Sequence, residues 1–236
     1  MVPCPWFFEF AEYAKVHKDL DIGVHITLTA EWDDFKWDGV LASSEIPSLL
    51  TEDGYFYASV EEVVKNADPL EFGKEINAQI ERALAFGINP THIDTHMGTV
   101  AATPEFIKEY IKAVIEYNIP VFIPSYIIQQ APQLQELIGP EQVIVDNFFM
   151  ISTDTPPSEW HEAYKQIIEN IKPGLNQLIV HLGIDNAEMQ AICKNPPDFG
   201  SAWRQLDYDC MVSDEFKELL NKNNIYPITW KQIKEL

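Results

Sequence analysis

The sequence predicts a single α/β domain whose parallel sheet is either open or closed into a barrel. Strand-like and helix-like segments alternate along the chain, and no linker-like change of composition interrupts residues 1–236. Parallel neighbours need a long crossover connection, which a helix usually provides. The strand-like segments are also apolar and rich in β-branched residues, as in sheets that are covered on both faces.

The first third of the chain contains clear signals for three of these elements. Residues 5–17 carry apolar side chains at helical spacing, with a proline near the first turn, and predict a helix. Residues 21–29 alternate apolar and polar side chains and predict a strand. After a polar and aromatic loop over residues 31–54, a second helical pattern covers residues 60–86, and Gly87 is expected to end it.

The rest of the chain continues the alternation. Thr103 is expected to cap a helix that has Pro104 at its first position. Including that helix, the expected order is strand 92–96, helix 104–117, strand 120–124, helix 131–138, strand 142–151, helix 157–171, strand 177–182, helix 214–223 and strand 225–228. The apolar strand QLIVHL at 177–182 is typical of a buried parallel sheet.

The charge of the chain excludes two classes of partner. Lys and Arg number 16 and Asp and Glu number 37, which gives a formal net charge of −21 with neutral histidines. A phosphate backbone would be repelled, and no cluster of basic residues offsets the effect, so no nucleic acid is expected to bind. The same charge disfavours an anionic lipid surface, and no apolar segment is long enough for a spanning helix, so no membrane association is expected.

Cysteine usage indicates the compartment. Cys4, Cys193 and Cys210 are far apart and form no CxxC pair, which is typical of free thiols in a reducing environment. A cytoplasmic location is therefore expected for the chain as numbered, whereas a missing leader would imply a secreted or periplasmic protein. The oligomeric state stays open, and a homo-oligomer is compatible with the sequence.

The densest group of chemically capable side chains is the HIDTH segment at 92–96. Alternate residues of a strand share a face, so His92, Asp94 and His96 are expected to point the same way. Burying three such groups is costly unless they bind a metal or perform acid–base chemistry. His25 and His181 lie in two other apolar strands, and taken singly each is more typical of a hydrogen-bonded core histidine. No GxSxG, P-loop, GxGxxG or HExxH motif points to a different chemistry.

Three motifs together resemble those of a known family. GVHITLT at 23–29, HIDTHMG at 92–98 and the strand that ends in His181 are similar in order and spacing to elements of the YdjC-like carbohydrate deacetylases. The resemblance covers nearly the whole chain. It implies a distorted parallel (β/α) barrel and a hydrolase that uses a divalent metal, Mg or Zn, to remove N-acetyl groups from amino-sugar oligosaccharides.

The resemblance also implies roles for particular residues. His25 and His96 match the metal-binding imidazoles, His181 matches the histidine near the reacting centre, and Asp94 matches the carboxylate of the middle motif. We therefore expect His25 and His96 to lie within coordination reach, and His181 to share their pocket as a proton donor without binding the metal. The residues expected to contact the sugar are Trp32, Trp37, Trp203 and Arg204.

The chain departs from the family pattern at three places. The family opens with a strand that ends in ADDFG, whose aspartates provide a metal ligand and a base, and the barrel expected here lacks that first strand. Gly98 replaces a common histidine, and the strand at 121–123 lacks a common arginine. These departures leave three hypotheses: a deacetylase whose recorded start is late, a non-catalytic relative that binds sugar through the aromatic loop at 32–37, and another metal-dependent barrel hydrolase. With two ligands only, weak metal binding is expected.

Overall fold

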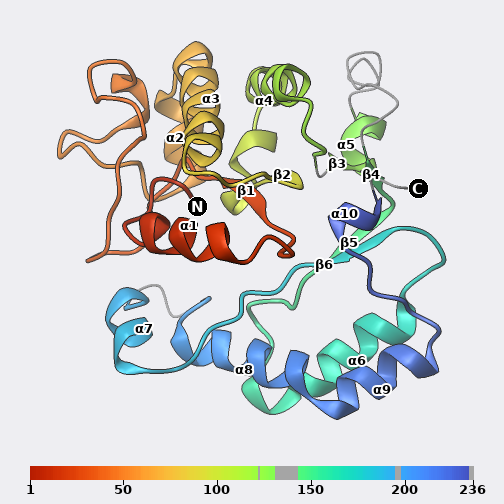
Figure 1. The fold of residues 1–236 in the computed structure, drawn as a ribbon. Helices are drawn as coiled ribbons and strands as arrows, with labels where there is room; N and C mark the ends of the chain where they lie inside the picture. The colour runs from red at the N-terminus through yellow and green to blue at the C-terminus, as the bar shows by residue number, and fades with distance from the viewer. Residues whose placement is uncertain (122, 131–142, 195–197, 234–236) are drawn as a thin grey trace.

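The structure is a computed structural model that describes residues 1–121, 123–130, 143–194 and 198–233. Helices and parallel strands alternate along most of the chain (Figure 1), so the predicted mixed α/β fold is confirmed. In chain order, the helices are α1 (Phe7–Val16), α2 (Val60–Asn66), α3 (Pro69–Ala85), α4 (Pro104–Tyr117), α5 (Ser125–Gln130), α6 (Trp160–Asn170), α7 (Ala187–Ile192), α8 (Ser201–Val212), α9 (Asp214–Lys222) and α10 (Trp230–Ile233). Among the described residues, none of these helices has the length and apolar character needed to cross a membrane.

The strands of the described ranges form three two-stranded parallel ladders. The pairs are β1 (Gly23–Ile26) with β2 (His92–Thr95), β3 (Ile123–Pro124) with β4 (Ile144–Val145), and β5 (Asn147–Phe149) with β6 (Asn176–Leu178). A parallel bridge between Ile93 and Val121 joins the first ladder to the chain that leads into β3. The parallel direction is confirmed, and closure into a barrel stays a prediction.

Local capping signals located helix starts well. The Thr103 side chain accepts a hydrogen bond from the Phe106 amide, and α4 begins at Pro104 as expected. The single helix predicted over residues 60–86 is divided into α2 and α3, because Asp68 starts a second helix by accepting hydrogen bonds from the amides of Leu70 and Glu71. The residue before a proline also disfavours helical backbone, and Pro69 follows Asp68 directly.

Several predicted elements in the second half of the chain are wrong or incomplete. Residues 225–228 form no strand, since Tyr226 and Ile228 are exposed and lead directly into α10. The strand expected at 142–151 is interrupted at Asp146 between β4 and β5. Helices α5, α7, α8 and α10 were not predicted from the sequence. In α8 one of the buried positions is an aspartate, Asp207, which hides the apolar pattern. The helix expected at 131–138 lies outside the described residues.

Buried apolar side chains form two clusters. The larger cluster gathers β1 and β2 with helices α1 to α4, in the upper part of Figure 1. The smaller cluster lies among α6, α8 and α9, in the lower part of the same view, and includes Trp160, Tyr164 and Phe216. Phe199 packs against both clusters, so the segment before α8 connects them.

The close packing of Gly23 against the His92 ring, within the β1–β2 ladder, can be tested by substitution. A β-carbon at this position would lie 2.4 Å from Nε2 of His92. The His92 ring cannot retreat easily, because it stacks on Trp230 with centroids 4.6 Å apart. We expect Gly23→Ala to lower the free energy of unfolding, measured in urea, by about 1–3 kcal/mol, the usual cost of overpacking. In a His92→Ala background the same substitution should cost much less, and an equal cost in both backgrounds would contradict this account.

Candidate functional site

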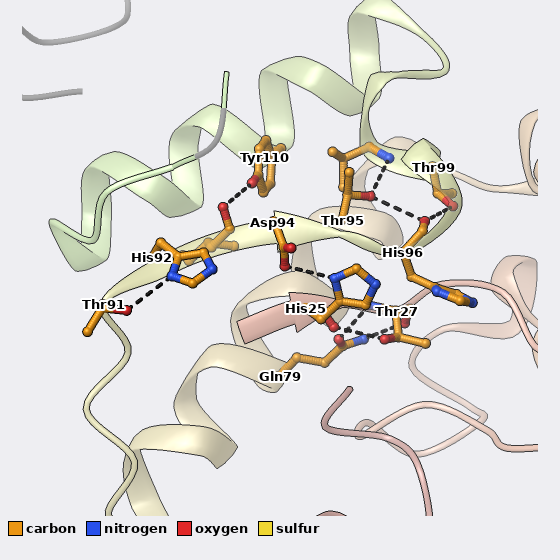
Figure 2. A network of polar contacts seen from close by, with 12 residues as sticks. His25, Thr27, Gln79, Thr91, His92, Asp94, Thr95, His96, Thr99 and Tyr110 are labelled. Carbon is orange, nitrogen blue, oxygen red and sulfur yellow. Dashed lines mark hydrogen bonds and ion pairs between the residues drawn. The ribbon is translucent and has the colours of Figure 1, made fainter. Parts of the chain in front are cut away.

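The first parallel ladder brings together His25, Asp94 and His96. The register pairs His25 with Asp94, and Nδ1 of His25 lies 2.8 Å from Oδ1 of Asp94 (Figure 2). His96 follows the last residue of β2, and its ring meets the His25 ring edge-on with centroids 5.4 Å apart. The expected approach of these two imidazoles is therefore present in the fold, at the carboxyl ends of adjacent parallel strands.

A carboxylate holds each of the two imidazoles. Oε2 of Glu31 lies 2.9 Å from Nε2 of His96, as Asp94 lies against His25. Burial alone raises the pKa of each carboxyl, but the hydrogen bond and charge of its histidine outweigh burial, so both pKa values lie below their ordinary range. Both carboxylates are therefore ionised at neutral pH. Glu31 was not predicted as a site residue from the sequence, although its place just beyond the strand motif GVHITLT was a usable signal.

The donor chemistry of this cluster suits a divalent metal at two positions. Because Asp94 occupies Nδ1 of His25, the other ring nitrogen of His25 is left for a ligand, and such carboxylate–histidine pairs commonly orient metal-binding imidazoles. Within the described ranges, however, no group of three or more His, Cys, Asp or Glu side chains converges as a metal site. His25 and His96 thus remain two candidate ligands, and their binding of a metal stays a prediction.

His92 does not belong to the same cluster. It pairs in register with Gly23 at the start of β2, and its ring stacks on Trp230 while Nδ1 contacts the Thr91 hydroxyl. Burial lowers the pKa of His92, so it is neutral at pH 7. The expectation that three groups of the HIDTH segment act together is corrected to two, because the strand places His92 at the opposite end from His96 (Figure 2).

The backbone at His181 is held by a fully buried carboxylate. Oδ2 of Asp207 accepts the His181 amide at 2.8 Å, while Oδ1 accepts the Trp160 indole at 3.0 Å and the Tyr164 hydroxyl at 2.5 Å. These three donors come from the chain beyond β6 and from α6. Asp207 therefore joins the His181 segment to the smaller apolar cluster.

The His181 side chain lies in an aromatic environment. Its ring centroid is 4.9 Å from that of Phe199 and 5.8 Å from that of Trp203, and its Nδ1 is buried without a hydrogen-bond partner in the described part of the chain. Burial lowers the pKa of His181 to about 4, assisted by the positive charge of Arg204 and by interactions with His25 and His96. His181 is therefore neutral at pH 7 and lies within electrostatic range of the other two histidines.

The four residues expected to contact a sugar have different environments. Trp32, Trp37 and Trp203 are only 5%, 4% and 9% exposed, and the Trp37 indole donates to the carbonyl of Thr29. The three tryptophan side chains are thus largely covered by other residues, and their contact with a sugar stays a prediction. Arg204 is partly exposed: its guanidinium lies 5.9 Å from the Trp32 ring centroid, and its Nε donates to the Phe199 carbonyl.

The lowered pKa of His181 predicts a pH effect on stability. Between the ordinary value of 6.5 and about 4, the unfolded chain binds a proton at this position that the folded chain does not bind. The free energy of unfolding should therefore decrease as pH falls through this window, and His181→Gln should weaken that decrease. NMR titration of the His181 ring protons measures the midpoint directly, and a midpoint at or above the ordinary value would refute the prediction.

Comparison with known proteins identifies the family. The model of the YdjC-like protein family matches residues 1–222. This chain belongs to that family. The YdjC-like resemblance carried by the three histidine motifs is thereby confirmed.

Relatives and solved structures agree with the assignment to the YdjC-like family. A carbohydrate deacetylase of Thermus thermophilus is 28% identical over 244 residues, which cover 100% of this chain and 83% of that protein. A carbohydrate deacetylase of Geobacillus stearothermophilus is 36% identical over 86 residues, which cover 36% of this chain and 31% of that protein. A crystal structure from Enterococcus faecalis V583, described as a cellobiose-phosphate cleavage protein, shares the fold with a TM-score of 0.79 at 19% identity, covering 99% of this chain and 85% of that one.

Proposed function

We propose that this YdjC-like chain is a carbohydrate deacetylase, a hydrolase that removes N-acetyl groups from amino-sugar oligosaccharides with the help of a divalent metal, Mg or Zn. The convergence of His25, Asp94 and His96 carries the proposal, because these residues lie at the carboxyl ends of adjacent parallel strands, where α/β folds place their ligands. A full-length relative named carbohydrate deacetylase supports it. The proposal includes a single domain over residues 1–236 with a barrel-like arrangement of its strands.

Hydrolysis of an amide needs an activated water, a stabiliser for the oxyanion and an acid for the leaving amine. When bound, a divalent metal would polarise the carbonyl and lower the pKa of a water. His25 and His96 are the residues that would hold it, while Asp94 and Glu31 orient their rings and keep negative charge beside them. A further ligand or base from a segment beyond these residues is compatible with this arrangement.

His181 is the residue proposed to move a proton at the leaving nitrogen. In its neutral form the imidazole offers one donor and one acceptor nitrogen, and Nδ1 has no partner among the described residues. An oxyanion that develops nearby would raise the pKa of His181, since a negative charge favours the imidazolium form. The ring could then accept a proton during attack of water and deliver it to the departing amine.

A non-catalytic sugar-binding role has less support. It depended on the aromatic loop at 32–37, and the rings of Trp32 and Trp37 are buried. The two carboxylate–histidine pairs would also have no evident use in a module that only binds neutral sugar. Another metal-dependent hydrolysis by the same residues is the remaining alternative, and a measurement of acetate release separates it from deacetylation.

The test is acetate release from N-acetylated chito-oligosaccharides, with Zn²⁺ or Mg²⁺ added and with chelator as control. We expect acetate release that chelator abolishes and that the double variant His25→Ala/His96→Ala lacks. Calorimetry should show weak Zn²⁺ binding, because the described residues bring two imidazoles together here. Sub-micromolar affinity would reveal a further ligand, with Asp94 and Glu31 the first to test. Sugar binding without acetate release under every condition would overturn the proposal.

A further inference from the structure

We propose that Gln79 and Glu75, one turn apart on α3, are positioning residues that hold the end of β1 and thereby fix the place of the His25 imidazole. The inference deepens the proposed function, because His25 matters for catalysis only if the chain is a hydrolase. Its structural part, however, concerns only the backbone at Thr27 and can be tested without any substrate.

Just after β1, the Gln79 side chain forms the two backbone hydrogen bonds that a neighbouring strand would otherwise form. Oε1 of Gln79 accepts the Thr27 amide at 2.9 Å, and Nε2 of Gln79 donates to the Thr27 carbonyl at 2.7 Å (Figure 2). In the described part of the chain, β2 is the one strand that pairs with β1, and that ladder ends at Ile26. The Gln79 amide therefore provides hydrogen-bond partners for both backbone groups of Thr27, the residue after Ile26. Thr27 and Gln79 are both fully buried.

Glu75 supports the orientation of the Gln79 amide. Its Oε1 accepts the remaining hydrogen of Gln79 Nε2 at 2.9 Å, and the carboxylate also accepts the amides of Val40 and Leu41 at 2.9 and 3.1 Å. A flipped Gln79 amide would place its oxygen against the Thr27 carbonyl, which can only accept, and its nitrogen against the Thr27 amide, which can only donate. The pair thus has one satisfied orientation, and it also attaches the loop at 40–41 to the strand end.

Few residues separate the backbone held by Gln79 from the two histidines of the site. His25 is two residues before Thr27, and the Thr27 hydroxyl donates to the His25 carbonyl at 2.8 Å. On the other side of Thr27 the chain continues to Glu31, which holds His96. Movement at Thr27 would therefore displace one histidine and the carboxylate of the other, and displacements of about 1 Å can cost an enzyme about 10²-fold in rate.

The test compares Gln79→Met with Ile80→Ala. Gln79→Met keeps the volume but removes both hydrogen bonds to Thr27, whereas Ile80→Ala removes a fully buried apolar side chain from the same helix and leaves the amide pair intact. We expect Gln79→Met to speed hydrogen exchange of the Thr27 amide at least about tenfold relative to Ile80→Ala at matched global stability. We also expect kcat to fall about 10–100-fold with KM changed little, while Ile80→Ala leaves kcat per folded molecule unchanged.

A second variant keeps the test decisive if Gln79→Met does not fold. Glu75→Gln preserves the shape but replaces one acceptor oxygen by a donor group, which weakens the support of the Gln79 amide, and it should also speed exchange at Thr27. Unchanged exchange at Thr27 in the variant that folds overturns the positioning role, whatever the activity. Faster exchange at Thr27 in a chain that releases no acetate supports the positioning role and refutes only the proposed function. Faster exchange at Thr27 with an unaltered kcat limits Gln79 and Glu75 to a structural role and overturns the inference.

Discussion

Replacing His181 by alanine should lower the turnover of N-acetylated chito-oligosaccharides about 10²–10⁴-fold, the usual contribution of a positioned proton donor. The expectation follows from the neutral imidazole, whose Nδ1 is buried without a partner among the described residues and whose pKa responds to His25 and His96. Metal content, measured by elemental analysis, should stay the same, because His181 is proposed to transfer a proton and not to bind the metal. Steady-state kinetics of acetate release measures the effect.

A matched control for this variant is His161→Ala. His161 lies on α6 and is exposed, so its removal should change neither turnover nor metal content. Loss of the metal in His181→Ala would instead make His181 a ligand. Turnover equal to that of the unmodified chain would return His181 to the role of a histidine that packs between Phe199 and Trp203.

Asp207→Ala should produce the largest loss of stability in the second half of the chain, about 3–5 kcal/mol in the free energy of unfolding. The carboxylate accepts the His181 amide, the Trp160 indole and the Tyr164 hydroxyl, and all three donors lose their partner when it is removed. A buried donor without a partner costs about 1–3 kcal/mol, so even partial relaxation around the gap leaves a large deficit. Urea denaturation followed by tryptophan fluorescence measures the loss.

Asp209→Ala is the control for that experiment. Asp209 is on the same helix and exposed, where it accepts a hydrogen bond from the Gln205 side chain. Its removal should change stability by no more than about 0.5 kcal/mol. Asp207→Asn, which keeps one acceptor oxygen, should fall between the two variants, and a stability equal to that of the unmodified chain in Asp207→Ala would show that the three donors find other partners.

Local signals were sufficient for much of the fold and for part of the site. Thr103 and Pro104 define the start of α4 because capping depends on a few adjacent residues. The β1 and β2 motifs place His25 and His96 at strand ends, and parallel pairing then brings the strand ends together whatever the distance along the chain. The same motifs resemble the YdjC-like family, which the family model confirms over residues 1–222.

Only the tertiary structure decided which side chains support those histidines. Glu31 holds His96, Gln79 holds Thr27 and Asp207 holds His181 across separations of 65, 52 and 26 positions, and no local pattern encodes such pairs. The sequence by itself determined the alternation of helices and strands, the helix caps and the places of His25 and His96 at strand ends, since these depend on neighbouring residues. The strand expected over 177–182 ends at Leu178 in the structure, so His181 lies beyond it. Whether a tryptophan or a carboxylate is buried depends on which distant residues pack against it. The tertiary structure was therefore needed to show that these side chains are buried.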